Sequence, residues 1–329
     1  MKTKLRIAFY LLSMAGFAQA PVASYYGTDN VVFDIVGTVN HAPTGANTTW
    51  NFTNLTSMGQ STDNEAVPTP TEITEFPGST AVVTTESLYD DNTTATFKVY
   101  SKAPANALSL TGIDNGELIL KYNTNNALLG TFPLNFGYNN SDNVAGNYDN
   151  GQYSGTFSGT IVTTIDAWGT LNVSGTGVNV YSGSVTRLKT VQNISLNYGA
   201  FSNVGTVTVT TYSYYGTDLF PAGIPRFRST LTTVSVPLLS INQSMTQNEA
   251  FSMVLLGTKP FEWSNNVSIA PNPVDDVLNI QSSTPIQSVT LTDVTGKIVL
   301  KENASANIAV GHLQKGMYFA TIQTDSGST

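Results

Sequence analysis

Short runs in which apolar and polar residues alternate recur along most of this chain, and no other feature constrains its fold as much. In the run 95–100, Ala95, Phe97 and Val99 point to one side and the residues between them point to the other. A period of two is that of a strand with one buried face. Another run of this kind lies at 206–212.

Turn residues separate these runs and predict hairpins between them. Leucines flank Asn115 and Gly116, and an Asn-Gly pair accepts the positive φ of a type I′ turn. Asn150 and Gly151 form a second such pair. No segment has a convincing helical period, and the prolines between residues 63 and 77 exclude a central strand there, leaving a loop or an edge segment. We therefore expect an all-β protein whose main part is a β-sandwich-like domain.

Charge and cysteine content exclude some classes of partner and site. The formal net charge is -8, whereas binding of a nucleic acid needs clustered Lys and Arg, so we expect no nucleic acid partner. The densest basic spots, Arg187 with Lys189 and Arg226 with Arg228, are expected to be solvated strand ends. The chain has no cysteine, which excludes disulfides and thiolate metal sites.

Residues 1–18 are typical of a cleavable signal peptide, with a basic start, an apolar run and small residues near the end. Cleavage after Ala20 would place Pro21 beside the scissile bond, where its ring hinders the peptidase. We therefore expect cleavage after Ala18 and a mature chain that begins at Gln19. No later apolar stretch is long enough to span a bilayer, so we expect no transmembrane segment.

The rest of the chain divides into three parts. Residues 19–258 carry most of the strand pattern and are expected to form one all-β passenger domain. Residues 259–266, with a proline and two asparagines, are expected to be a linker. Residues 267–329 have their own short strands, in which Val289 and Leu291 share a face before a polar turn.

This last segment resembles the type A sorting domain of the type IX secretion system. It contains, in order, that family's PNP-x-x-x-x-L-x-I opening, its D-x-x-G-K turn and its L-x-x-G-x-Y segment. The residues that match are Pro271, Asn272, Pro273, Asp293, Gly296, Lys297, Leu313, Gly316 and Tyr318.

The resemblance implies an immunoglobulin-like sandwich that the outer-membrane translocon reads after the chain has crossed the periplasm. It also implies removal of this domain, with the cargo secreted or joined to lipopolysaccharide at the outer-membrane surface. Members of the family continue into a last strand with a basic tail, whereas this sequence ends at Thr329. Either the sequence is a fragment or its terminal signal is degraded.

The passenger resembles an uncharacterised group of secreted proteins of Bacteroidota. The resemblance is carried by GANTTWNF at 45–52, by Phe132 with Pro133, and by DAWGTL at 166–171 followed by Arg187. It implies a single domain and no known activity.

Motifs of catalysis are missing from the passenger. Histidine occurs only at His41, which is expected in a polar turn, and at His312 in the C-terminal segment, so a His triad or zinc cluster cannot assemble within the passenger. A glycosidase needs only two carboxylates, but most acids lie at predicted turns, where Asp accepts local backbone hydrogen bonds. The candidates for a carboxylate pair are Glu86, Asp90, Asp91, Glu117, Asp149 and Asp166.

Calcium is a second alternative, because one segment is rich in oxygen ligands. A surface loop rich in Asn and Asp accounts for the same residues without a metal. They are Asn140, Asp142, Asn143, Asn147, Asp149 and Asn150.

Tyr212, Tyr214 and Tyr215 cluster beside the second copy of a repeat, SYYGTD, at 24–29 and 213–218. Such rings either stack on sugars or fill the core of the domain. The two copies are either equivalent aromatic sites or two strand ends that turn at Gly-Thr-Asp.

We therefore expect a secreted or cell-surface cargo of the type IX secretion system with a non-catalytic passenger and no cofactor. The passenger is expected to be adhesive or glycan-binding, and a glycosidase is the alternative. The expected partners are the type IX translocon and sorting machinery and a surface lipopolysaccharide or polysaccharide.

Overall fold

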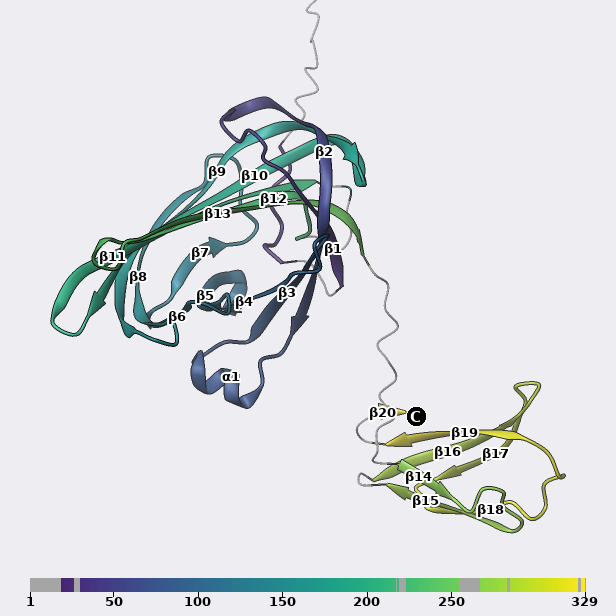
Figure 1. The fold of residues 1–329 in the computed structure, drawn as a ribbon. Coiled ribbons are helices and arrows are strands. Elements are labelled where there is room, and N and C mark those ends of the chain that lie inside the picture. Colours follow the sequence, from purple (N-terminus) through teal and green to yellow (C-terminus); the bar gives the residue numbers. More distant parts are fainter. Residues whose placement is uncertain are drawn as a thin grey trace, which may run out of the picture. The chain divides into compact units, whose positions relative to one another are not determined.

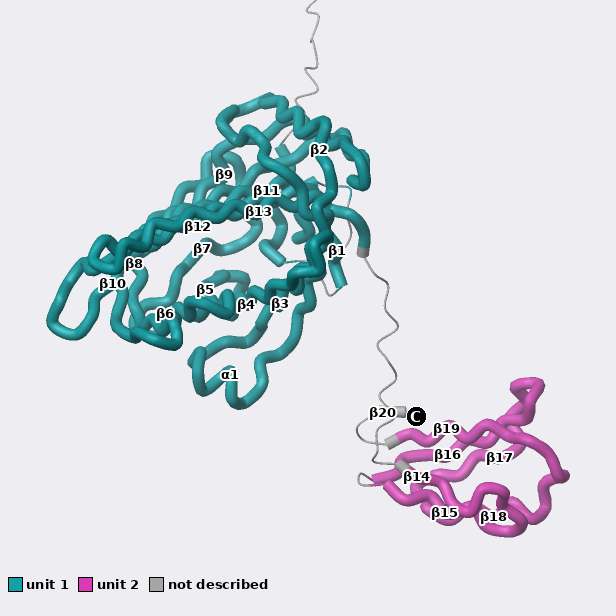
Figure 2. The backbone as a smooth tube through the Cα atoms, in the orientation of Figure 1, with its two compact units in different colours: residues 1–256 teal, residues 257–329 magenta. Residues whose placement is uncertain are grey.

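The computed structural model describes residues 19–26, 30–216, 218, 223–254, 267–282, 285–324 and 327–328. The chain divides into two compact units, residues 1–256 and 257–329 (Figure 2). The expected leader, 1–18, and linker, 259–266, lie outside the described residues. Strands account for 70% and helices for 4% of the structure, which confirms the all-β prediction. No helix in the described part of the chain is long and apolar enough to cross a membrane.

The N-terminal unit is built on one continuous sheet (Figure 1). Its strands are β1 (Val31–Val36), β2 (Gly45–Ala66), β3 (Ala81–Tyr89), β4 (Thr94–Lys102), β5 (Ala107–Asp114), β6 (Ile119–Asn125), β7 (Ala127–Thr131), β8 (Asn139–Asp149), β9 (Ser154–Thr176), β10 (Val178–Tyr198), β11 (Phe201–Gly216), β12 (Pro225–Val236) and β13 (Ile241–Val254). They pair in the order β4-β3-β2-β1-β13-β12-β11-β10-β9-β8-β6-β5-β7.

This sheet closes on itself twice. β4, at one end of the strand order, also pairs with β5, near the other end, and this pairing closes a wide ring of strands. β2 also pairs with β9 in parallel. This pairing closes a narrow ring that consists of β9, β10, β11, β12, β13, β1 and β2. The expected sandwich would have two separate sheets, whereas here the long strands β9 and β10 run through both rings and keep all the strands in one sheet.

Each ring has its own core. In β9, Phe157 and Ile161 belong to the core of the wide ring, and Leu171 and Val173 belong to the core of the narrow ring. These residues alternate with less buried ones along the strand, as the period of two predicts.

The two predicted Asn-Gly hairpins are present, and their turns are built by side chains. Asp114 Oδ1 accepts the Gly116 N–H at 2.8 Å, and Asn115 Oδ1 accepts the Leu118 N–H at 2.7 Å. Only the glycine has a positive φ, 80°, so the turn is not type I′. The sequence Asp-Asn-Gly at 149–151 makes the same two contacts between β8 and β9.

The expectation that 63–77 has no helix is wrong, whereas among the described strands residues 64–66 pair with β3 alone, as the expected edge segment would. β2 continues to Ala66 and pairs there with β3, and the helix α1 (Pro70–Glu75) follows. Thr69 and Glu72 form a reciprocal capping box, and Pro70 occupies the first turn of the helix.

The C-terminal unit is a two-layer sandwich with a single core. One sheet pairs β14 (Val267–Ala270), β15 (Val277–Ser282) and β18 (Asn307–Ala309), and the other pairs β16 (Ile286–Asp293), β17 (Ile298–Asn303), β19 (Tyr318–Thr324) and β20 (Gly327–Ser328). Leu278 and Ile308 from the first sheet share a buried cluster with Val289, Leu291 and Ile322 from the second.

The narrow ring depends on a close approach between β2 and β9. Thr48 lies opposite Gly169, and Trp50 lies opposite Leu171. A Cβ atom at Gly169 would overlap the backbone of Thr48. The segments GANTTWNF and DAWGTL are therefore partners in one parallel ladder.

Arg187 joins the strands of this ring from inside. Its Nε and Nη2 atoms each donate to Asp166 of β9 at 2.8 Å, and Nη1 donates to the backbone oxygen of His41 at 2.7 Å. The guanidinium also lies 5.3 Å from the ring centre of Trp50. Arg187 is fully buried, so the expectation that it is a solvated strand end is wrong. A buried guanidinium needs such a complete set of partners.

His41 belongs to the same cluster: Asn40 Oδ1 accepts the Ala42 N–H in the expected polar turn, but the side chain of His41 packs among aromatic rings. Its ring stacks on Tyr212 with centroids 4.4 Å apart, and its Nδ1 lies 2.8 Å from the Tyr214 hydroxyl. Burial, aided by the positive charge of Arg187, lowers the pKa of His41 to about 4.

We predict that Gly169→Ala destabilises the N-terminal unit by about 2–3 kcal/mol, because the strands must separate to admit the methyl group. Gly37→Ala is the control, since no atom lies within 4 Å of the Cβ position there. Urea unfolding of both variants measures the difference. Equal unfolding midpoints would show that β2 and β9 do not approach so closely.

We also predict that His41 makes the stability of the folded protein depend on pH. An unfolded histidine takes up a proton near about pH 6.5, whereas folded His41 does so near pH 4. Between these values the unfolded state binds more protons, so the contribution of His41 is complete above about pH 6.5 and is lost as the pH falls. The urea midpoint should therefore fall less between about pH 7 and about pH 4.5 in His41→Gln than in the wild type. Equal falls in the two proteins would contradict the lowered pKa.

Candidate functional site

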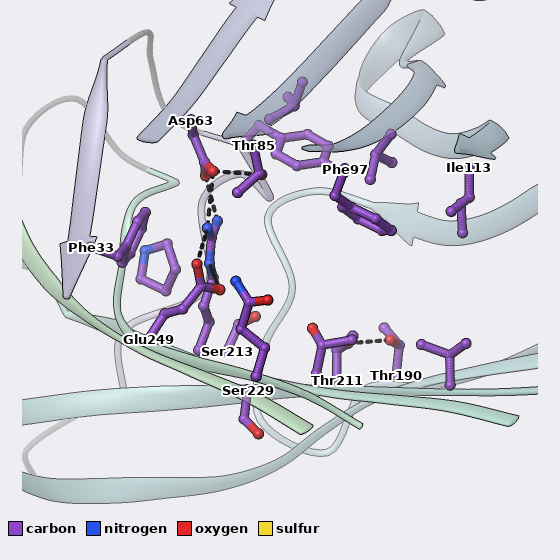
Figure 3. A pocket seen from close by; sticks show the side chains of 18 of the residues that line it. Phe33, Asp63, Thr85, Phe97, Ile113, Thr190, Thr211, Ser213, Ser229 and Glu249 are labelled. Atoms are coloured by element: carbon purple, nitrogen blue, oxygen red, sulfur yellow. Dashed lines mark hydrogen bonds and ion pairs between the residues drawn. The ribbon is translucent and has the colours of Figure 1, made fainter. Parts of the chain in front are cut away.

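A cavity of about 330 Å³ lies inside the wide ring (Figure 3). Phe97 and Ile113 line one side of it, and Thr190 and Thr211 lie across from them. Much of the remaining wall is aliphatic and comes from strands on all sides of the ring, including Val83, Val99, Leu110, Leu129, Ile161 and Val209.

One end of the cavity is polar and centres on Arg228 of β12. Its Nε donates to Glu249 at 2.7 Å, and its Nη2 donates to both Asp63 and Glu249 at 2.9 Å. Nη1 donates to the second oxygen of Asp63. The guanidinium stacks 4.0 Å from the ring centre of Phe33. These contacts link β12 to β2, β13 and β1, and the expectation that Arg228 is a solvated strand end is wrong.

Hydroxyl groups complete the bonding of the two carboxylates. Thr85 donates to Asp63 at 2.7 Å, and Ser61 donates to Glu249. Burial would raise the pKa of Glu249, but the charge and hydrogen bonds of Arg228 outweigh burial and lower that pKa. In the same way, Asp63 and Glu249 outweigh the effect of burial on Arg228 and raise its pKa well above the usual range. Arg228 and Glu249 are therefore ionised at neutral pH.

The two copies of the SYYGTD repeat meet beside this polar end. The Tyr215 hydroxyl donates to the backbone oxygen of Tyr25 at 2.9 Å, and the rings of Tyr25 and Tyr26 meet edge to face. All three tyrosines line the cavity, and burial raises their pKa values. The copies therefore contribute to one site, although residues 27–29 lie outside the described part of the chain.

The cavity opens where the wall of the wide ring is incomplete. Among the described strands, residues 241–247 of β13 pair with β12 alone, because the pairing of β1 with β13 begins only at Asn248. Met245 and Phe97 line the cavity and are 60% and 37% exposed. Exposed lining residues on β13 and β4 place the mouth of the cavity between these strands.

The three tyrosines proposed to bind glycans do not share a face. Tyr212 and Tyr214 point into the narrow ring and contact Arg187 and His41, whereas Tyr215 points into the cavity. Tyr214 and Tyr215 are buried. Glycan binding by these residues stays a prediction, and their burial offers no exposed ring for it.

The six acids proposed as a carboxylate pair are dispersed. Only Glu117 lines the cavity. Asp166 binds Arg187, and Asp91 and Asp149 accept backbone hydrogen bonds within their own turns. Glu86 and Asp90 are exposed on and beside β3.

The residues considered for calcium lie mainly on the strand β8, where a loop was expected. Asp142 accepts the Leu128 N–H at 2.8 Å, and Asn140 donates to the Leu128 backbone oxygen at 3.1 Å. In the described part of the chain, no group of three or more His, Cys, Asp or Glu residues is placed to hold a metal ion.

Sequence reasoning missed Asp63, Arg228 and Glu249, which form the polar end of the cavity. Their only local signal is a charged residue at an inward position of an alternating strand. The ion pair between Asp63 and Arg228 joins residues 165 positions apart, and no local pattern specifies such a partner.

The sorting motifs occupy turns and strand starts of the C-terminal unit. Asp293 Oδ1 accepts the N–H groups of Thr295 and Lys297 at 2.9 and 3.1 Å, and Gly296 has a φ of 84°. This is the tight turn between β16 and β17. The remaining motif residues lie between β14 and β15 (Pro271, Asn272, Pro273), before β19 (Leu313, Gly316) and at the start of β19 (Tyr318).

Comparison with known proteins agrees with this geometry. Residues 268–329 match the family described as the secretion system C-terminal sorting domain. No curated protein and no solved structure matches the chain. The C-terminal unit is therefore a type IX secretion sorting domain, and the chain is a cargo protein of that secretion system.

Proposed function

We propose that the N-terminal unit is a non-catalytic binding protein that holds a small amphiphilic molecule in its cavity. The observation that carries this proposal is a cavity whose wall is mainly apolar, with one charged end and a mouth at the side. Its volume of about 330 Å³ is at the lower end of the range for sites that bury a small ligand. The polar end would fix the head of the ligand, and the aliphatic walls would surround its body.

The state of the two carboxylates supports binding over hydrolysis. A glycosidase needs one carboxylic acid with a raised pKa to protonate the leaving group. Here both Asp63 and Glu249 hold Arg228, and the pKa of Glu249 is lowered. This pair is therefore not prepared for general acid catalysis.

An adhesive or glycan-binding role is the second candidate, and a different surface supports it. Tyr198 and Phe201 are exposed where β10 turns into β11, and the Tyr198 ring lies 5.9 Å from that of Tyr153. Exposed rings of this kind could stack on a surface polysaccharide or lipopolysaccharide.

We further infer that the C-terminal unit acts as a sorting signal that is removed after export. The chain would enter the periplasm through its leader, and the translocon would then read the sorting domain and leave the N-terminal unit outside the cell or on its surface. The division of the chain into two compact units, each with its own core, supports this separation of roles.

We predict that deletion of residues 267–329 retains a folded N-terminal unit in the periplasm. Cell fractionation measures the location, and thermal unfolding compares the retained protein with the N-terminal unit of the full chain. Export of the shortened chain would contradict the role of the sorting domain. Loss of its fold would contradict the independence of the two units.

We also predict that the mature protein binds the neutral fluorescent probe phenylnaphthylamine at about one site per chain. Ala95→Trp should weaken this binding by about tenfold or more, because Ala95 lines the exposed side of the cavity, where an indole would obstruct entry. Ala200→Trp adds the same side chain at an exposed turn away from the cavity and should bind like the wild type. Absence of probe binding, or equal binding by both variants, would contradict the proposed site.

A further inference from the structure

The wall of the cavity carries an excess of negative charge. Four acids line it, Asp63, Glu65, Glu117 and Glu249, and Arg228 is the only Lys or Arg among the described lining residues. An interior of low dielectric constant strengthens the effect of each of these charges on a bound molecule.

Arg228 is already paired with carboxylates of the cavity wall. Four of its hydrogen bonds go to Asp63 and Glu249, and a guanidinium has five N–H groups in all. A carboxylate or phosphate entering the cavity would therefore lack a free guanidinium to bind and would lie beside two acids. A buried anion without a partner is strongly disfavoured.

A cation in the same position has the opposite effect. The group of Arg228, Asp63 and Glu249 has one more negative than positive charge, and an ammonium group beside it would balance that excess. Glu65 follows Asp63 by two positions on β2, so both side chains lie on the cavity face of the strand.

The rest of the cavity suits a hydrocarbon chain. Between the polar end and the mouth, aliphatic side chains such as Val83, Leu129 and Val209 alternate with side chains that carry hydroxyl groups, such as Thr190 and Thr211. Burial of a hydrocarbon chain there would contribute most of the affinity, and the charge at the polar end would decide between head groups.

We propose that the cavity selects amphiphiles with a cationic head, such as an alkylamine, and rejects alkyl carboxylates of the same length. This inference rests on the proposed binding function and adds the chemical class of the ligand.

The test compares decylamine, decanol and decanoate as competitors of bound phenylnaphthylamine at neutral pH and low salt. These three molecules share one alkyl chain and differ in head group. Decylamine should displace the probe at a concentration about tenfold or more below that of decanoate, with decanol between them. Decanoate that competes as well as decylamine, or better, would overturn the inference while leaving the proposed cavity intact. Failure of the probe to bind at all would instead overturn the proposed function.

A pair of matched variants tests whether the cavity wall is the cause. Glu65→Gln removes one lining charge at a residue other than the two carboxylates that Arg228 binds, so it should reduce the amine-to-carboxylate preference by about threefold or more. Glu86→Gln removes the same charge from the outer face of β3, where Glu86 is exposed between Thr85 and Ser87, which line the cavity. That variant should keep the wild-type preference. An equal preference in both variants and the wild type would overturn the contribution of Glu65 to this selection and would assign the selection to the group of Arg228, Asp63 and Glu249 alone.

Discussion

The parallel pairing of β2 with β9, held by the buried guanidinium of Arg187, is the contact on which the N-terminal unit depends. The first half of β2 lies against β9, and its second half lies between β1 and β3. One strand therefore belongs to two rings, and the interior of the unit is divided in two. A guanidinium inside a protein is stable only with a full set of partners, and here the partners come from β9, from the segment before β2 and from the aromatic rings around them.

The two interiors differ because their rings differ in size. Trp50, Phe52, Tyr214 and Phe227 fill the narrow ring with aromatic contacts. The wide ring contains more strands, and closed sheets with more strands have interiors that side chains no longer fill. The cavity and its polar end follow from this difference. Arg228, Asp63 and Glu249 tie β12, β2 and β13 together at the polar end of the cavity.

Local sequence patterns predicted the strands, the two Asp-Asn-Gly hairpins and the sorting motifs, because each depends on residues a few positions apart. The helix α1 also had a local signal, Thr69-Pro70 followed by Glu72, which was overlooked among the prolines. Local patterns could not predict that the sheet closes into rings or that the wide ring encloses a cavity. Arg187 bonds to a residue 146 positions away and Arg228 to one 165 positions away, and alternation specifies which face of a strand is buried without specifying its distant partner.

An amphiphile that enters the wide ring must contact the side chains that line its cavity. Methyl-resolved NMR of the mature protein during a titration with decylamine measures this contact. We expect shifts at the methyl groups of Val83, Ile113 and Val209, which line the cavity, and unchanged signals from Leu171 and Val173 in the narrow ring. Unchanged signals from all of the cavity methyl groups, or shifts confined to the narrow ring or the outer surface, would contradict binding in the cavity.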